Sequence, residues 1–196
     1  MNSDFLSIRI RQQEGNTLKN SRVANGTVGT EDLSDTSFES VEFERVKFEK
    51  THLQRAKFTN CRFVNCSLVE CDLTRSEISI CVFENCDLPS IEIDYAFISG
   101  CRFTGCKMTS PTLVKGIIDD SEFIGCNLRQ ANFLKAGLDN VRFERSHLES
   151  IRLTKAVLVR TYFVSCILDD TDFTKTTIDK PTREHLEQGG ILLKTS

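Results

Sequence analysis

The chain has 196 residues, enough for one domain with a buried core, and its formal net charge is −3. This mild negative charge excludes a general electrostatic attraction to nucleic acid or to an anionic membrane. No window approaches the ~20 apolar residues of a membrane span, and the first residues, MNSDFLSIRIRQQEG, lack the apolar core of a secretory signal. We therefore expect a cytoplasmic protein in which nine cysteines, an odd number, do not form a closed disulfide scheme.

The first segment, residues 1–15, precedes the regular part of the sequence. Its apolar residues Phe5, Leu6, Ile8 and Ile10 are expected to cover the open end of the fold that follows, because the ends of repeat proteins need a cap.

The 165 residues from 16 to 180 divide into 33 units of five without an insertion. The third residue of every unit, from Leu18 to Ile178, is Leu, Phe, Ile, Val or Met, and 12 of the 14 phenylalanines occupy this position. Neither a helix nor a flat strand keeps a period of five on one face. Every central residue can face a common interior if the backbone bends at each unit. Four units then make a square coil of twenty residues, and stacked coils share one core.

These units resemble the pentapeptide-repeat pattern A(D/N)LXX, in a variant rich in Cys and Phe, and the resemblance covers residues 16–180. It implies an all-β fold, a right-handed quadrilateral β-helix with a short N-terminal cap and a C-terminal tail. With ~4.8 Å between stacked strands, the coils make a rod of roughly 40 Å. Every central residue should be buried, and residues twenty apart should stack. One aromatic column is then Phe43, Phe63, Phe83, Phe103, Phe123, Phe143 and Phe163.

All nine cysteines occupy the small inward position, two residues before a central residue. They are Cys61, Cys66, Cys71, Cys81, Cys86, Cys101, Cys106, Cys126 and Cys166. Cysteines five apart lie on different sides of the coil, so four of them cannot converge on a zinc ion. Stacked cysteines have parallel Cβ vectors, which disfavours disulfides. We therefore predict free, buried thiols with raised pKa values and low reactivity, and no metal or cofactor.

Outward columns hold the candidate interaction residues. The last residue of each unit on one side forms a column that we call the basic stripe: Arg55, Arg75, Tyr95, Lys115, Lys135, Lys155 and Lys175. Six cations in seven stacked positions suit a phosphate backbone or an acidic protein partner, or else form a solvated edge whose lysines resist aggregation. Acids gather on the neighbouring side, together with Asn140. This acidic side is Asp119, Asp120, Asp139 and Asp179.

A third column is apolar at a position that is otherwise outward and polar. We call Phe97, Ile117 and Val157 the apolar column; Gly137 lies between Ile117 and Val157, and Val159 flanks them. Either an interaction surface or local packing under the terminal segment explains it.

The tail, residues 181–196, reads PTREHLEQGGILLKTS. It predicts a short helix over residues 183–188, capped by Thr182 and ended by Gly189 or Gly190, followed by a short apolar strand at 191–193. Ile191, Leu192 and Leu193 need a cover, which either a fold-back lid or two-fold pairing between two chains provides.

No catalytic motif is present in the sequence and its three histidines are isolated, so we expect no enzymatic activity.

The chain is similar to the pentapeptide-repeat proteins that bind DNA gyrase and topoisomerase IV, some of which protect these enzymes from quinolones or peptide toxins. In those relatives the rod resembles duplex DNA, and a C-terminal module similar to REHLEQGGILLK makes a dimer. The resemblance implies a non-enzymatic, DNA-mimic-like binder of a type II topoisomerase that confers resistance to its inhibitors. The alternative is a rigid protein–protein interaction scaffold without a topoisomerase role. Direct binding of nucleic acid is not expected.

Overall fold

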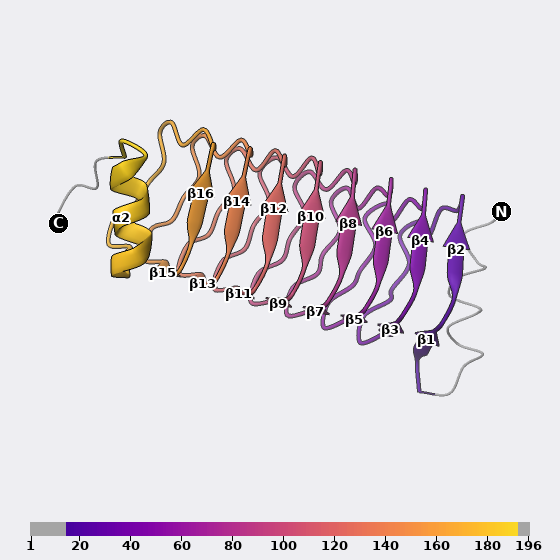
Figure 1. Ribbon diagram of the computed structural model, residues 1–196. Helices are drawn as coiled ribbons and strands as arrows, with labels where there is room; N and C mark the ends of the chain where they lie inside the picture. The colour runs from indigo at the N-terminus through magenta and orange to yellow at the C-terminus, as the bar shows by residue number, and fades with distance from the viewer. Residues whose placement is uncertain (1–14, 192–196) are drawn as a thin grey trace.

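The computed structural model describes residues 15–191, which form a four-sided β-helix (Figure 1). Two of its sides are parallel β-sheets, and the other two are joined by isolated bridges between residues twenty apart, such as Lys47 with Ser67 and His52 with Asp72. The predicted fold class is confirmed, because the five-residue frame runs through the coils without a loop.

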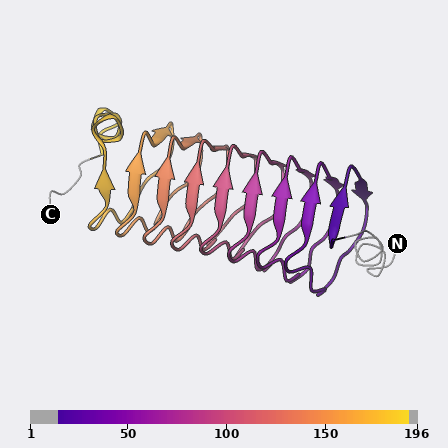
Figure 2. The ribbon, with the colours of Figure 1, turned by 90° about the horizontal axis from the view of Figure 1, so that it is seen from below.

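Odd-numbered strands form a nine-stranded sheet, the odd-strand sheet, whose parallel arrows Figure 2 shows side by side. Its strands are β1 (Thr17–Lys19), β3 (Ser37–Glu39), β5 (Lys57–Thr59), β7 (Glu77–Ser79), β9 (Phe97–Ser99), β11 (Ile117–Asp119), β13 (Gly137–Asp139), β15 (Val157–Val159) and β17 (Thr177–Ile178). Neighbouring strands pair in a register of twenty residues, as Ile117 does with Phe97 and Gly137.

Even-numbered strands form the eight-stranded even-strand sheet on the adjacent side. Its strands are β2 (Arg22–Ala24), β4 (Glu42–Glu44), β6 (Arg62–Val64), β8 (Val82–Glu84), β10 (Arg102–Thr104), β12 (Glu122–Ile124), β14 (Arg142–Glu144) and β16 (Tyr162–Val164).

The corners between sides are made by the last residue of each unit, which adopts a left-handed backbone. Lys135 has a φ of 60° and Asn60 a φ of 53°, and nearly every fifth residue behaves in the same way. This conformation costs a non-glycine residue roughly 1–2 kcal/mol. The ladder offsets the cost because most corner N–H groups are hydrogen-bonded to the next coil, as Asn60 is to the carbonyl of Ser79 at 3.0 Å.

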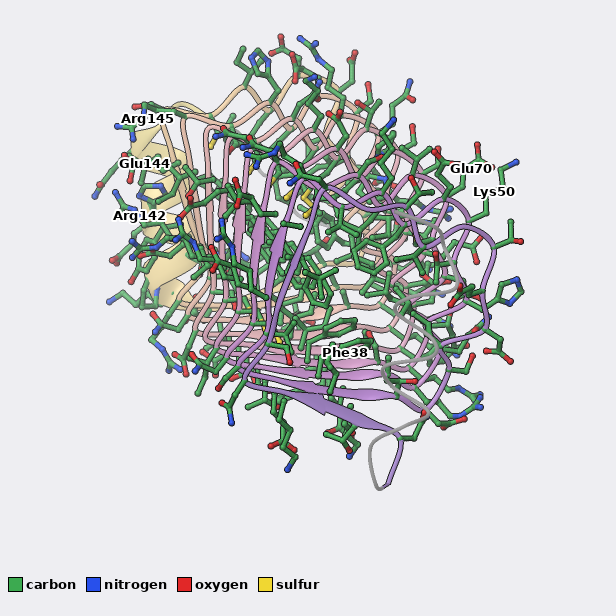
Figure 3. All side chains as sticks on the ribbon, turned by 90° about the vertical axis from the view of Figure 1, so that its right-hand side faces the viewer. Phe38, Lys50, Glu70, Arg142, Glu144 and Arg145 are labelled. Carbon is green, nitrogen blue, oxygen red and sulfur yellow. The ribbon has the colours of Figure 1, made fainter. Side chains whose placement is uncertain are left out.

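Inside the coils the central residues form one continuous core, into which Phe38 points in Figure 3. Rings in the predicted aromatic column stack at 4.5–5.2 Å between centroids from Phe43 to Phe163. The prediction that every central residue is buried is wrong at the two ends, because an end coil has a neighbouring coil on one side only. The partly buried central residues are Val23, Leu168, Phe173 and Ile178.

Within residues 15–191 there is one helix, α2 (Lys180–Gln188), which lies at the C-terminal end of the rod and contacts β15 and β16 (Figure 1). It begins three residues earlier than predicted. Its cap is Asp179, whose side chain accepts a hydrogen bond from the backbone N–H of Thr182, so the prediction that Thr182 is the cap is wrong. Pro181 fits the first turn, where a helix needs no internal N–H donor. Gly189 is the C-cap, as expected.

The expected cap residues Phe5 to Ile10, and Leu192 and Leu193 of the tail, lie outside the described residues. Ile191 is described and packs against the core. Across residues 15–191, no helix is both long and apolar enough to cross a membrane.

Candidate protein interaction surface

The three columns predicted from the sequence lie side by side on the outer face of the odd-strand sheet. In the coil of β11, Lys115 stands at the corner, Ile117 is the first strand residue and Asp119 the third. Alternate residues of a strand point to the same face, and Ile118 between them is buried. The outer face therefore presents a cation, an apolar side chain and an anion in turn.

The basic stripe is present as a stacked, exposed column, and its first member, Arg55, is neutralised. Arg55 forms two hydrogen bonds to Asp35, at 2.7 and 2.6 Å. Further along, the Tyr95 ring lies between two cations: Arg75 is 5.7 Å and Lys115 4.9 Å from its centroid. Cation–π attraction to the ring of Tyr95 offsets part of the repulsion between these stacked cations.

Beyond Tyr95 the lysines of the stripe lack counter-ions. Lys115 donates to the hydroxyl of Tyr95 at 3.1 Å. Within the described range, Lys135, Lys155 and Lys175 form no ion pair. The C-terminal half of the stripe is therefore available to an acidic group on another molecule.

The apolar column is exposed. The exposed fractions are 37% for Phe97, 51% for Ile117 and 44% for Val157. A Cβ placed on Gly137 would meet nothing within 4 Å, so this position leaves a gap in the column. The described part of the tail, up to Ile191, leaves these side chains exposed, which favours an interaction surface over local packing.

On the acidic side, three of the four carboxylates have partners. Asp139 is paired with Arg160, Asp120 accepts a 2.7 Å hydrogen bond from the amide of Asn140, and Asp179 is the cap of α2. Asp119 has no side-chain hydrogen bond or ion pair to any residue from 15 to 191. Burial and the nearby carboxylates of Asp139 and Asp120 raise the pKa of Asp119.

Ion pairs on the even-strand sheet were not predicted from the sequence. In Figure 3, Glu144 lies between Arg142 and Arg145, with which it pairs at 3.0 and 2.7 Å. Arg62 with Glu84 at 2.6 Å repeats the arrangement. The sequence feature that predicts such ion pairs is the occurrence of Arg and Glu at outward positions twenty or twenty-two residues apart. Since these charges neutralise each other, this face is a weaker candidate than the odd-strand sheet.

The nine cysteines are free thiols. Cys166 is only partly buried, which corrects the expectation that all are buried, because it lies in the last full coil. The expectation of uniformly raised pKa values is also wrong. Burial raises the pKa of Cys71 to about 12. Hydrogen bonds from neighbouring thiols instead lower the pKa values of Cys61, Cys101 and Cys126.

Hollows on the surface of the described residues include the following two. One of about 380 Å³ is lined by Lys47, Glu49 and Lys50, and one of about 260 Å³ by Arg102, Asp120 and neighbouring residues. In the part of the chain that the structure describes, no cluster of three or more His, Cys, Asp or Glu side chains is placed to hold a metal ion.

An uninterrupted four-sided coil with an ordered outer face defines a β-solenoid repeat protein. The chain belongs to the pentapeptide-repeat family: the family model described as a pentapeptide repeat region matches residues 96–173, and the model for eight copies of the pentapeptide repeat matches residues 51–89. Among curated proteins, none matches the chain.

Solved structures of the same fold include HetL from the cyanobacterium Nostoc, described as involved in the regulation of heterocyst differentiation. It is 14% identical over 92% of this chain and 98% of its own, with a TM-score of 0.42. A trypsin-treated variant of QnrB1, a plasmid-mediated fluoroquinolone resistance protein, is 15% identical over 90% and 99%, with a TM-score of 0.38. A pentapeptide repeat protein from the thylakoid lumen of Arabidopsis thaliana is 16% identical over 81% and 76%, with a TM-score of 0.24. These likenesses concern the fold alone.

Proposed function

We propose that the protein is a non-enzymatic scaffold that binds a protein partner through the outer face of its odd-strand sheet, from β9 to β15. The observation that carries the proposal is the outward row of the exposed Lys115 and Ile117 and the partly buried Asp119, with Lys135 and Asp139 at the same places in the next coil. An apolar centre with charged margins is the usual anatomy of a protein–protein interface. Because the backbone is held by the ladder, binding there requires little ordering.

Matched variants test the proposal. Ile117→Asp places a charge in the apolar column, whereas Ile167→Asp, on the side of the coil opposite the odd-strand sheet, replaces an equally apolar residue that is 41% exposed. Proteins that co-purify with the tagged chain from its own cells should be retained by Ile167→Asp and lost from Ile117→Asp. If both variants retain the same proteins, this face is not the binding surface.

A type II topoisomerase is the partner that the resemblance of the repeats and tail to gyrase-binding relatives implies. QnrB1, described as a fluoroquinolone resistance protein, shares the fold. The basic stripe departs from a uniformly acidic, DNA-like surface, so DNA mimicry would have to use the acidic side. Resistance to topoisomerase inhibitors would then follow from binding at that side.

Gyrase supercoiling and quinolone-induced cleavage, measured with the purified protein, test this finer proposal. Mimicry predicts that the effect weakens with salt and is lost in Asp119→Lys with Asp120→Lys. A contact through the basic stripe predicts instead that Lys115→Glu abolishes the effect. If the wild-type protein changes neither supercoiling nor cleavage, the topoisomerase role is wrong and the scaffold proposal remains.

The cap at residues 1–15, the dimerisation role of residues 181–196 and a cytoplasmic location remain predictions. Contacts of α2 with β15 and β16 support a capping role for the first part of the tail.

A further inference from the structure

Charges on the outer face of the odd-strand sheet are distributed unevenly along the rod. In the N-terminal half most of them are paired within the chain: Lys19 with Glu39 at 2.8 Å, Arg55 with Asp35 at 2.6 Å and Lys57 with Glu77 at 3.0 Å. Arg75 is the exception, since its contact is with the ring of Tyr95. In the C-terminal half, and within residues 15–191, Lys135, Lys155 and Asp119 have no side-chain hydrogen bond or ion pair. The unpaired charges occur in the same coils as the exposed apolar column.

The same coils repeat a short pattern. A corner Lys is followed four residues later by an outward Asp in KGIID (115–119), KAGLD (135–139) and KTTID (175–179). The residue midway between them belongs to the apolar column in the first case and continues its line in the others. Across the face, Lys, the middle residue and Asp are thus separated by equal steps of two residues.

A face with this order is complementary to itself. Rotation by 180° about an axis that runs along the rod above the apolar column exchanges the two margins. In the coils of β11 and β13 the corner lysine of one copy then faces the aspartate of the same coil in the other copy, whereas Lys155 faces Val159 in the coil of β15. The apolar columns face each other. A two-fold axis parallel to the strands would instead set the basic stripe against itself.

We infer that this face binds a second copy of the chain, with the two rods parallel and side by side. Lys115 and Asp119 of one copy face Asp119 and Lys115 of the other, and Ile117 packs against its equivalent. The inference rests on the proposed function, since it names the partner of the same face. A single two-fold interface of this kind is closed and produces a dimer.

Self-association provides counter-charges for the basic and the acidic margin of the face at once. A partner with charges of one sign provides them for one margin only. An acidic partner would neutralise Lys115 and Lys135 but would face the unpaired carboxylate of Asp119. In the dimer the carboxylate of Asp119 meets the ammonium group of Lys115, which offsets the repulsion that Asp119 receives from Asp139 and Asp120.

The dimer is expected to be concentration-dependent. At ~4.8 Å per coil, the strands from β9 to β15 span only about 15 Å, a patch smaller than those of stable interfaces, so the association is expected to be weak. Its charge pairs lie at the margins, so added salt should weaken it.

Sedimentation velocity of the full chain over a concentration series tests the inference. We expect a monomer–dimer equilibrium for the wild type. Lys115→Glu makes the coil of β11 acidic at both margins, and Asp119→Lys makes the same coil basic at both. Each variant alone should dimerise at least about tenfold more weakly, and an equimolar mixture of the two should restore the dimer.

Ile117→Asp should be monomeric and Ile167→Asp should behave like the wild type. All substituted positions are at the surface, and circular dichroism of each variant checks that it is folded. A chain ending at Ile191 separates this dimer from one made by the tail, because only a tail-mediated dimer requires Leu192 and Leu193.

A monomeric wild type overturns the inference, and so does a mixture that dimerises no better than its components. Loss of the dimer in the chain ending at Ile191 overturns it as well. If the chain does not form this dimer but Ile117→Asp still loses a co-purifying protein, the proposed function remains supported. A restored dimer with no face-dependent protein from cells supports the second copy as the partner.

Discussion

The Nε2 atom of His185, on α2, accepts a hydrogen bond of 3.1 Å from the backbone N–H of Phe163 in the last even strand. The imidazole also lies edge-on to the ring of Tyr162, with centroids 5.4 Å apart. No further coil follows β16, so its N–H groups need acceptors from elsewhere. A helix side chain provides one.

Two more side chains of the tail do the same. Thr182 Oγ1 accepts from the N–H of Thr161 at 2.9 Å, and the carboxylate of Asp179 accepts from the N–H of Arg160 at 3.0 Å. The start of α2 therefore replaces the edge of a missing coil, and its docking protects the end of the solenoid from pairing with another chain.

His185→Ala removes one of these acceptors and should lower the free energy of unfolding by about 1–3 kcal/mol, because the N–H of Phe163 loses its partner. Urea denaturation measures the change, and faster amide exchange at Phe163 should accompany it. His52→Ala, at an exposed outer position, is the control and should change stability little. Equal stability of the two variants would contradict a capping role for His185.

Phe103→Ala should lower the free energy of unfolding by about 3–5 kcal/mol, since it opens a cavity in the aromatic column. The Phe103 ring is stacked between Phe83 at 4.6 Å and Phe123 at 4.7 Å. Phe103→Asp should prevent folding, because it places an unpaired charge in the core. Thermal denaturation compares these variants with Phe97→Ala, which truncates an exposed ring and should cost much less. A comparable loss for Phe97→Ala would show that exposure does not govern stability here.

Titration of the native protein with a thiol reagent should modify Cys166 first, since it is the only cysteine that is partly exposed. The other eight, all buried, should react only after denaturation. Cys166→Ser should remove the native reaction and leave the denatured total one thiol lower. Rapid native modification of several thiols would mean that the coils open, because burial is what limits their access.

Glu149 predicts an acid-labile contribution to stability. A side-chain hydrogen bond from Arg129, at 2.6 Å, lowers the pKa of Glu149 from 4.5 to about 2. Because the folded-state pKa is the lower one, the stabilisation is complete above pH 4.5 and is lost as the pH falls towards 2. The difference in unfolding free energy between wild type and Glu149→Gln should shrink across that window. A difference that is independent of pH would contradict the pairing.

Much of the candidate interaction surface on the odd-strand sheet was predictable from the stacking of residues twenty apart. The basic stripe and the apolar column follow from the twenty-residue repeat of the coils, which assigns Lys115 and Ile117 to their columns. Whether those charges are already neutralised was not predictable. Arg55 meets Asp35 and Tyr95 receives two cations because long side chains lean along the rod, and the repeat does not specify that direction.

The amino-acid sequence by itself determined the coil, its core and the order of its columns, because a period of five acts locally and is repeated in every unit. The tertiary structure decided what happens where the repetition stops. Partial burial of Phe173 and Cys166 follows from the absence of a further coil beyond them. The start of α2 at Lys180 depends on a docking contact between the helix and the last strands, β15 and β16. Such a contact is made once, between different kinds of element, so no period in the sequence reports it.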